Sequence, residues 1–267
     1  MKRQVLKHQF LSLLLAATLL GGGTAAHADL LDDVVKAKKL RVSTDLAIPP
    51  SGMIDGNLKP TGSDVEVAEL LAKDLGLELE FIQTTGATRI PNVQTNKADV
   101  IVSTLSVTPE RAKVIEFTKP YAKLQSVVGC LKSVEIKDWP DLKGRTIAVA
   151  RGTTQDTAIT GMRDRDLKPQ RYDDDATLIT AAVSGQSDCV ASSATIVGQI
   201  GVKNPSRVFE PKVPLATFDL AMGVRKGETR FLEKLDAWID VNTKNGKLNA
   251  IYKKFHGVDL PPELRGS

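Results

Sequence analysis

Apolar residues recur at helical spacing in one stretch of the chain and alternate in the next. Within residues 65–75 they stand three or four positions apart, which predicts an amphipathic helix that ends at Gly76. Leu77, Leu79 and Phe81 then alternate with polar residues, as in a strand with one buried face. The same patterns predict helices over 30–38 and 89–96 and strands over 40–44 and 100–103. This alternation favours a mostly parallel sheet covered by helices.

The alternation resumes after Tyr121. The pattern predicts an extended segment over 126–132, strands over 146–150 and 189–191, and helices over 176–183, 229–244 and 248–255. Asp175 is the expected N-cap of the helix over 176–183. Residues 96–100 and 185–190 echo one another, since each closes a helix and opens a short apolar strand. Pro205, Pro211 and Pro214 break up the segment before 220–224, where we expect connections between two lobes of similar construction.

The N-terminus has the features of a secretory signal peptide. Lys2, Arg3 and Lys7 precede a mostly apolar stretch over 10–20, and Ala26-His27-Ala28 forms a small-x-small cleavage site. We therefore expect residues 1–28 to be removed and the mature chain to begin at Asp29. About eleven apolar residues are too few for a membrane span, and no later segment is long and apolar enough for one.

The composition of the chain argues against nucleic acid as a binding partner. The chain has 36 basic and 32 acidic residues, and loss of the three basic residues of the leader leaves a net charge of about +1. Basic residues are scattered and aromatic residues are few, so a nucleic-acid surface is not expected. Cys130 and Cys189 fit no metal motif, and either a disulfide or two buried thiols is compatible with the sequence.

Two polar clusters follow predicted strands. Residues 103–111 (STLSVTPER) place hydroxyls at a strand end, with Thr108 as N-cap and Pro109 at the first helical position. Arg111 adds a guanidinium that can hold a carboxylate with two hydrogen bonds. Because ligands of open α/β sheets lie beyond the carboxyl ends of strands, this cluster is a candidate anion site, and the alternative is a capped helix with a surface arginine.

The second cluster is residues 151–156 (RGTTQD), which come directly after the strand over 146–150. Gly152 permits close approach of the backbone, and Thr153 and Thr154 supply hydroxyls and amides at a helix start. The turn lacks the Gly-Lys-Ser/Thr ending of a P-loop. It is a second candidate anion site or a simple strand-to-helix turn.

Several ordered motifs resemble the polar amino-acid-binding proteins of ABC transporters. They are residues 61–71 (TGSDVEVAELL), residues 99–121 with the hydroxyl-rich TPER run and FTKPY, residues 144–149 (GRTIAV) and residues 152–155 (GTTQ). The resemblance runs from about residue 30 to about residue 260.

The resemblance implies a two-lobed α/β fold of the type II periplasmic binding proteins. Each lobe would be a mostly parallel sheet flanked by helices, with two crossing strands between the lobes. We expect lobe one over 29–123 and 221–267, and lobe two over 124–220. The implied function is capture of a small carboxylate-bearing ligand, an amino acid first of all, by hinge closure in the periplasm. The implied partner is an ABC transporter permease in the inner membrane, and the protein would be a monomer without cofactor or metal.

The resemblance also implies which residues contact the ligand. Arg111 would clamp the α-carboxylate, with Thr104 and Ser106 around the carboxylate and amine and Ser103 nearby. Thr154, with the Thr153 turn, would complete the cradle from lobe two. Asp45 would contact the ligand side chain. Arg89, in the motif Arg-Ile-Pro, would meet a side-chain carboxylate or, alternatively, lie in solvent or pair with an aspartate.

Three residues depart from the family pattern. Ile48 and Ser51 occupy positions where the family often has aromatic residues. Ser193 occupies the lobe-two position where it often has an acidic partner for the ligand ammonium. Either another carboxylate, such as Asp45, meets the amine, or the ligand is an organic acid without one.

Other function classes stay open. Some relatives of this fold are dehydratases, but the predicted cleft offers Asp45 as its one candidate acid and no catalytic pair. A sensor module would need a membrane partner, and a structural protein would show no saturable binding of a small molecule.

Overall fold

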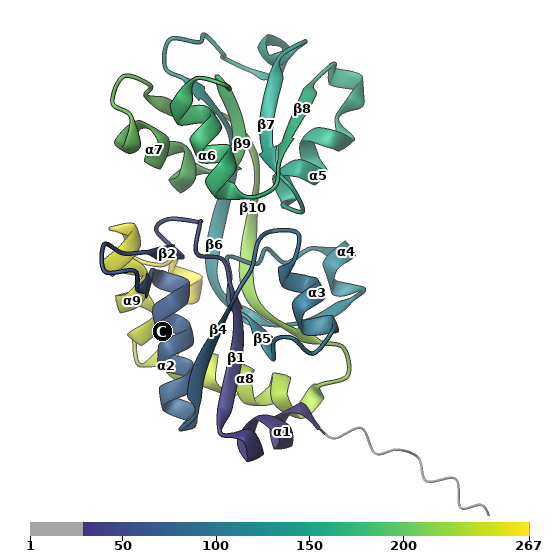
Figure 1. Cartoon of the computed structure of the whole chain (residues 1–267), viewed down its shortest axis with the longest axis vertical. Coiled ribbons are helices and arrows are strands. Elements are labelled where there is room, and N and C mark those ends of the chain that lie inside the picture. The colour runs from purple at the N-terminus through teal and green to yellow at the C-terminus, as the bar shows by residue number, and fades with distance from the viewer. Residues whose placement is uncertain (1–28, 267) are drawn as a thin grey trace, which may run out of the picture.

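The computed structural model describes residues 29–266, and the predicted signal peptide over 1–28 lies outside them. Figure 1 shows two bodies, one above the other, connected by the strands β6 (Ile115–Leu131) and β10 (Phe209–Arg225). Within residues 29–266 no helix combines the length and the apolar character that a membrane span requires.

Lobe one contains the N-terminal elements and the C-terminal helices (Figure 1). Its elements are α1 (Leu30–Ala37), β1 (Lys39–Thr44), β2 (Met53–Ile54), β3 (Pro60–Thr61), α2 (Ser63–Leu75), β4 (Glu78–Gln83), α3 (Arg89–Gln94), β5 (Val100–Ile101), α4 (Pro109–Ala112), α8 (Thr229–Lys244) and α9 (Lys247–His256). The predicted end of the 65–75 helix is confirmed, because Gly76 adopts a left-handed conformation and its N–H bonds to the carbonyls of the last turn. A final short turn, η3 (Pro262–Leu264), follows α9.

Lobe two is built from the middle of the chain. Its elements are η1 (Trp139–Leu142), β7 (Thr146–Ala150), α5 (Thr154–Gly161), η2 (Arg163–Arg165), β8 (Lys168–Tyr172), α6 (Asp175–Ser184), β9 (Cys189–Ser193) and α7 (Ala194–Lys203). The N-cap predicted for α6 is wrong by one residue. Asp174 is the cap, since its carboxylate accepts from Thr177 N, and Asp175 is the first helical residue.

One eight-stranded sheet passes through both lobes, in the order β4-β1-β5-β10-β6-β9-β7-β8. The outer pairs β1–β4, β1–β5, β7–β8 and β7–β9 are parallel, while β6 and β10 run antiparallel through the middle. The prediction of two crossing strands between mostly parallel sheets is therefore confirmed. Pro211 and Pro214 lie inside β10, where the pairing with β6 shifts register, because proline has no N–H for the ladder.

Separate apolar cores support the two lobes. The largest cluster lies in lobe one and packs α1, α2, α8 and α9 against the sheet. Two clusters in lobe two cover the faces of its strands. Ile48, from the loop after β1, is the lobe-one residue that joins a lobe-two cluster. The lobes thus meet through an apolar contact beside the hinge.

Cys130 and Cys189 form a disulfide in lobe two. They are register partners on the antiparallel strands β6 and β9, so the sheet itself places them side by side. This answers the question that the sequence left open.

Candidate functional site

Arg111 lies at the junction of the two lobes. Thr108 caps α4 and Pro109 begins it, as the sequence predicted, and this short helix positions Arg111 in its last turn. The Arg111 Nη1 donates to the carbonyl oxygen of Ser106 at 2.9 Å, and Nη2 donates to that of Gly152 in lobe two at 3.1 Å. Burial, and after it the charge of Arg89, lowers the pKa of Arg111 to about 9. Arg111 forms no ion pair with any residue between 29 and 266.

Arg89 is a second guanidinium beside the junction. It is the first residue of α3 and only 4% exposed, so the solvent-exposed alternative is wrong. Its Nη1 donates to the carbonyl oxygen of Ser103 at 2.6 Å, while its buried Nε has no partner within the described chain. Burial lowers the pKa of Arg89, and the nearby carboxylates of Asp45 and Asp175 act against that change. Two cations therefore lie in a desolvated region without a directly bonded acid.

The hydroxyls of the 103–106 segment have different environments. Ser103 Oγ accepts from the backbone N–H of Asp45 at 3.0 Å and so ties β1 to the loop after β5. Thr104 has a positive φ of 46°, and its N–H and Oγ1 both donate to one carboxylate oxygen of Asp64 at 2.7 Å. Ser106 is buried and bridges to Leu220. Asp64, a residue of the 61–71 motif whose role the sequence did not indicate, thus holds a strained turn in place.

Lobe two contributes two helix starts. Thr153 is the N-cap of α5, since its Oγ1 accepts from Asp156 N and donates to Ala150 O. Thr154 is the first residue of α5. Ser193 is the N-cap of α7, and its Oγ accepts from Ile196 N and contacts Thr195 Oγ1 at 2.9 Å. The hydroxyls of Thr153 and Ser193 are therefore already hydrogen-bonded to backbone groups.

Two buried aspartates lie near the arginines. Asp45 Oδ1 accepts from Ala47 N, while its Oδ2 has no partner in the described chain, and burial raises its pKa to about 6. Asp175 is 3% exposed, and burial followed by the charge of Asp45 raises its pKa to about 7. Arg89 partly offsets both shifts. A cation that binds next to such a carboxyl lowers its raised pKa and favours the ionised form, which then pairs with the cation.

A cavity between the lobes collects most of the predicted residues. We call it the interlobe cavity, and it is lined by Ile48, Arg89, Thr104, Ser106, Leu124, Thr153, Thr154, Gln155, Asp175, Ser192, Ser193 and Ile196. Arg111 reaches its edge through hydrogen bonds to the carbonyls of Ser106 and Gly152, whereas Asp45 and Ser103 are not part of its wall. Asp175 is the acid that the sequence analysis missed, because it was assigned to a helix cap.

Backbone segments of the two lobes touch next to this cavity. A Cβ added at Gly152 would lie 2.6 Å from Ala87 Cα, and one added at Gly86 would lie 2.8 Å from Arg151 O. Only glycine permits this approach of the loop before α3 to the turn before α5.

No group of three or more metal-ligating side chains occurs within residues 29–266.

The sequence profile of the bacterial extracellular solute-binding proteins, family 3, matches residues 40–258. This chain belongs to that family. Within family 3, ABC transporter arginine-binding protein 1 of Escherichia coli (strain K12) is 29% identical over 206 residues, which cover 75% of this chain and 83% of that protein.

Two solved structures support the same assignment. The solute receptor for L-cysteine of Neisseria gonorrhoeae superposes with a TM-score of 0.81 at 30% identity, over 89% of this chain and 98% of that one. The ancestral amino-acid-binding protein AncCDT-1, a precursor of cyclohexadienyl dehydratase, gives a TM-score of 0.76 at 30% identity, over 84% of this chain and 98% of that one. The family 3 chain described here therefore has the fold of the type II periplasmic binding proteins.

Proposed function

We propose that this protein captures a free α-amino acid by hinge closure and delivers it to an ABC importer. The observation that carries the proposal is the position of Arg111, which contacts both lobes and lacks an acidic partner in the described chain. A ligand carboxylate at this place forms two charge-assisted hydrogen bonds with the guanidinium. Because the same side chain reaches Gly152, anion binding favours the conformation in which the lobes meet.

Asp175 is the proposed partner of the ligand ammonium. It lines the interlobe cavity from lobe two, as Ser193 does, and it supplies the negative charge that Ser193 lacks. The nearby carboxyl group of Asp45 adds negative charge to this region and so favours a bound cation. Thr104, Ser106 and Thr154 complete the wall around the ligand head group.

The second candidate ligand class is the dicarboxylates, and the acidic amino acids belong to it. It is favoured by Arg89, whose buried Nε has no partner in the described chain and whose side chain lines the same cavity. Both candidates use Arg111 in the same way, and they differ in the group that approaches Arg89 and Asp175.

The cellular setting is part of the proposal. Removal of residues 1–28 would release a monomer beginning at Asp29 into the periplasm, where an inner-membrane permease accepts the closed form. Residues 29–123 with 221–267 would move as lobe one, and residues 124–220 as lobe two. Binding without turnover is proposed, and detection of a converted product by mass spectrometry would contradict it.

The test is a thermal-shift screen of the chain from Asp29, with amino acids and matched amine-free acids. A ligand that binds only the folded state raises the melting temperature. A shift with α-amino acids alone supports the ammonium contact at Asp175. A shift with amine-free dicarboxylates alone supports the second candidate, and no shift with any acid contradicts both.

A further inference from the structure

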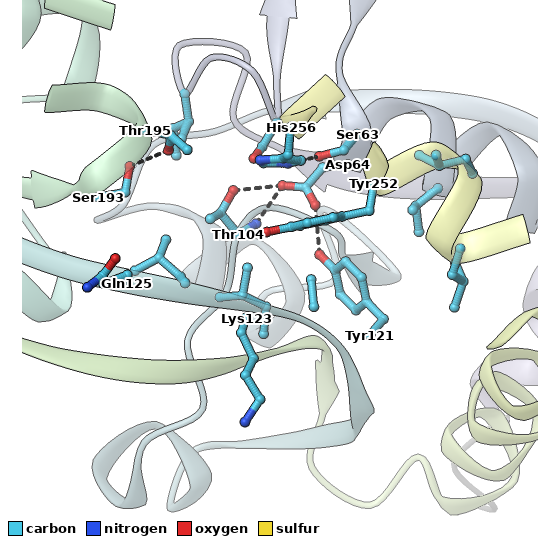
Figure 2. Close-up of a pocket in the computed structure, with 18 of the residues that line it drawn as sticks. Ser63, Asp64, Thr104, Tyr121, Lys123, Gln125, Ser193, Thr195, Tyr252 and His256 are labelled. Atoms are coloured by element: carbon cyan, nitrogen blue, oxygen red, sulfur yellow. Dashed lines mark hydrogen bonds between the residues drawn. The ribbon is translucent and has the colours of Figure 1, made fainter. Parts of the chain in front are cut away.

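A second cavity lies beside the hinge, on the side of helix α9 (Figure 2). We call it the hinge cavity, and it has a volume of about 190 Å³. Its apolar wall consists of Ile48, Val67, Ala122, Leu124, Ala194, Leu220, Leu248 and Ile251. Figure 2 shows Tyr252 and His256 reaching into this space from α9, opposite Ser193 and Thr195 of lobe two.

The hinge cavity adjoins the interlobe cavity. Four residues belong to the walls of both, namely Ile48, Thr104, Leu124 and Ser193. These shared residues have short or aliphatic side chains. A head group among Thr104, Ser106 and Arg111 therefore lies next to the wall that the hinge cavity shares with the interlobe cavity.

The ionisable residues of the hinge cavity already have partners within the protein or are held in a form that burial favours. Asp64 accepts from Thr104 N, Thr104 Oγ1 and Tyr121 Oη, at 2.7 to 2.8 Å, so both of its oxygens are occupied. Lys123 pairs with Asp219 and Glu263, each at 3.2 Å, and in Figure 2 its ammonium group points away from the cavity. Burial lowers the pKa of His256, which favours the neutral ring. An occupant of this cavity therefore finds the carboxylate oxygens of Asp64 hydrogen-bonded and the ammonium of Lys123 ion-paired, and this favours an uncharged occupant.

Two aromatic residues of α9 give the cavity a flat wall. The rings of Tyr252 and His256 stack with their centroids 4.1 Å apart. His256 Nε2 contacts Ser63 Oγ at 3.1 Å, while the buried Nδ1 has no partner in the described chain. This arrangement suits an apolar or aromatic group, with one hydrogen-bonding position for a neutral polar atom.

We propose that the hinge cavity receives the tail of the bound carboxylate, and that this tail is uncharged and of the size of an aromatic ring. The inference rests on the proposed function, because it assumes a carboxylate head group at Arg111. It adds the ligand class, which is a carboxylate or α-amino acid with an aryl or similarly bulky apolar side chain. Aliphatic cavities of about this size accommodate a benzene ring.

The test is isothermal titration of the chain from Asp29 with two matched series. One series is alanine, phenylalanine and homophenylalanine, and the other is propionate, 3-phenylpropionate and 4-phenylbutyrate. Burial of a phenyl group is expected to raise the affinity about tenfold or more over the short member, with up to about fourfold for a further buried methylene. Equal affinity for the short and aryl members within both series overturns the inference.

A pair of variants locates the tail. Ile251 lines the hinge cavity but not the interlobe cavity, and Ile251→Trp is expected to weaken the aryl ligands about tenfold while leaving alanine and propionate within about twofold. Leu232→Trp is the control, because Leu232 packs against the same lobe-one core and lines neither cavity. Ile251→Ala enlarges the cavity and should favour the longer tail. An unchanged preference in both Ile251 variants overturns the inference.

Titration of Arg111→Ala with the same two series separates this inference from the proposed function. If Arg111→Ala abolishes binding of the short members but tail length has no effect, the head-group site stands and the tail site is wrong. If no member of either series binds, or if Arg111→Ala changes no affinity, the proposed function itself fails.

Discussion

The guanidinium of Arg111 donates a hydrogen bond to the carbonyl oxygen of Gly152, 3.1 Å away in the other lobe. One side chain thereby links the segment predicted to bind an anion in lobe one with the corresponding turn in lobe two. In the proposed mechanism, a carboxylate bound to Arg111 is within reach of both lobes, and recognition and closure then depend on the same residue. This relationship leads to the first prediction.

Arg111→Ala is expected to weaken ligand binding about 100-fold, because a partly buried cationic partner of the carboxylate is lost. Titration calorimetry with the best ligand of the thermal-shift screen measures the change. Arg151→Ala is the matched control, since Arg151 lies in the neighbouring turn, is largely exposed and pairs with Asp173. Equal loss in the two variants would contradict the role of Arg111.

Gly86→Ala is expected to hinder closure without destabilising either lobe. The added Cβ would lie 2.8 Å from Arg151 O and 3.1 Å from Thr153 Cγ2, both across the junction. We expect about tenfold weaker binding and a smaller ligand-induced decrease in the radius of gyration by X-ray scattering. Gly56→Ala is the control, because its Cβ would meet no atom within 4 Å. Compaction equal to that of the wild type would show that this contact does not limit closure.

Ligand affinity is expected to depend on the titration of Asp175. Its pKa is raised to about 7 by burial and by Asp45, and the other charged groups acting on it are Arg89 and Asp174. An ammonium ligand requires the carboxylate form, so affinity should fall about 100-fold between pH 8 and pH 5. Asp175→Asn should bind more weakly at pH 8 and lose most of this dependence. An ammonium ligand that binds with the same pH profile in both proteins would exclude the ammonium contact.

The stability of the ligand-free protein should respond to the same group in the opposite direction. The pKa of Asp175 is 3.8 in the reference state and about 7 in the fold, so the folded state holds the proton more tightly. Its contribution to the free energy of unfolding is complete below about pH 4 and is lost as pH rises to about 7, by about 4 kcal/mol at most. Denaturant unfolding at several pH values, compared between the wild type and Asp175→Asn, measures this difference. Parallel curves would place Asp175 in a solvated environment.

Loss of the disulfide is expected to destabilise lobe two but not the site. Cys130 and Cys189 are 59 residues apart in sequence and lie away from both cavities. The double variant Cys130→Ala/Cys189→Ala should lose about 2–4 kcal/mol of unfolding free energy. Ligand affinity at 25 °C should stay within about twofold of the wild type. A large loss of affinity would instead connect this pair with the cleft.

The sequence by itself determined most of the local structure and brought forward the residues proposed to bind the ligand head group. The spacing of apolar residues located the alternating helices and strands. Gly76 ends α2 and Thr108 caps the start of α4, as the sequence predicted from their backbone and capping preferences. Local signals failed for β8 and α7, which the pattern did not predict. The strand β8 alternates little and is largely exposed, and α7 contains two glycines. The long strands β6 and β10 exceeded their predicted ranges because they are stabilised by each other across the hinge.

Only the tertiary structure decided which side chains line the interlobe cavity. Asp174 and Asp175 are adjacent and chemically equal in the sequence, yet one caps a helix and the other lines the interlobe cavity. The pairing of Cys130 with Cys189 depends on the register of two strands. The hinge cavity combines residues from α2, β6, α7 and α9. Contacts between segments so distant along the chain depend on how the lobes pack, and no local pattern of residues encodes that packing.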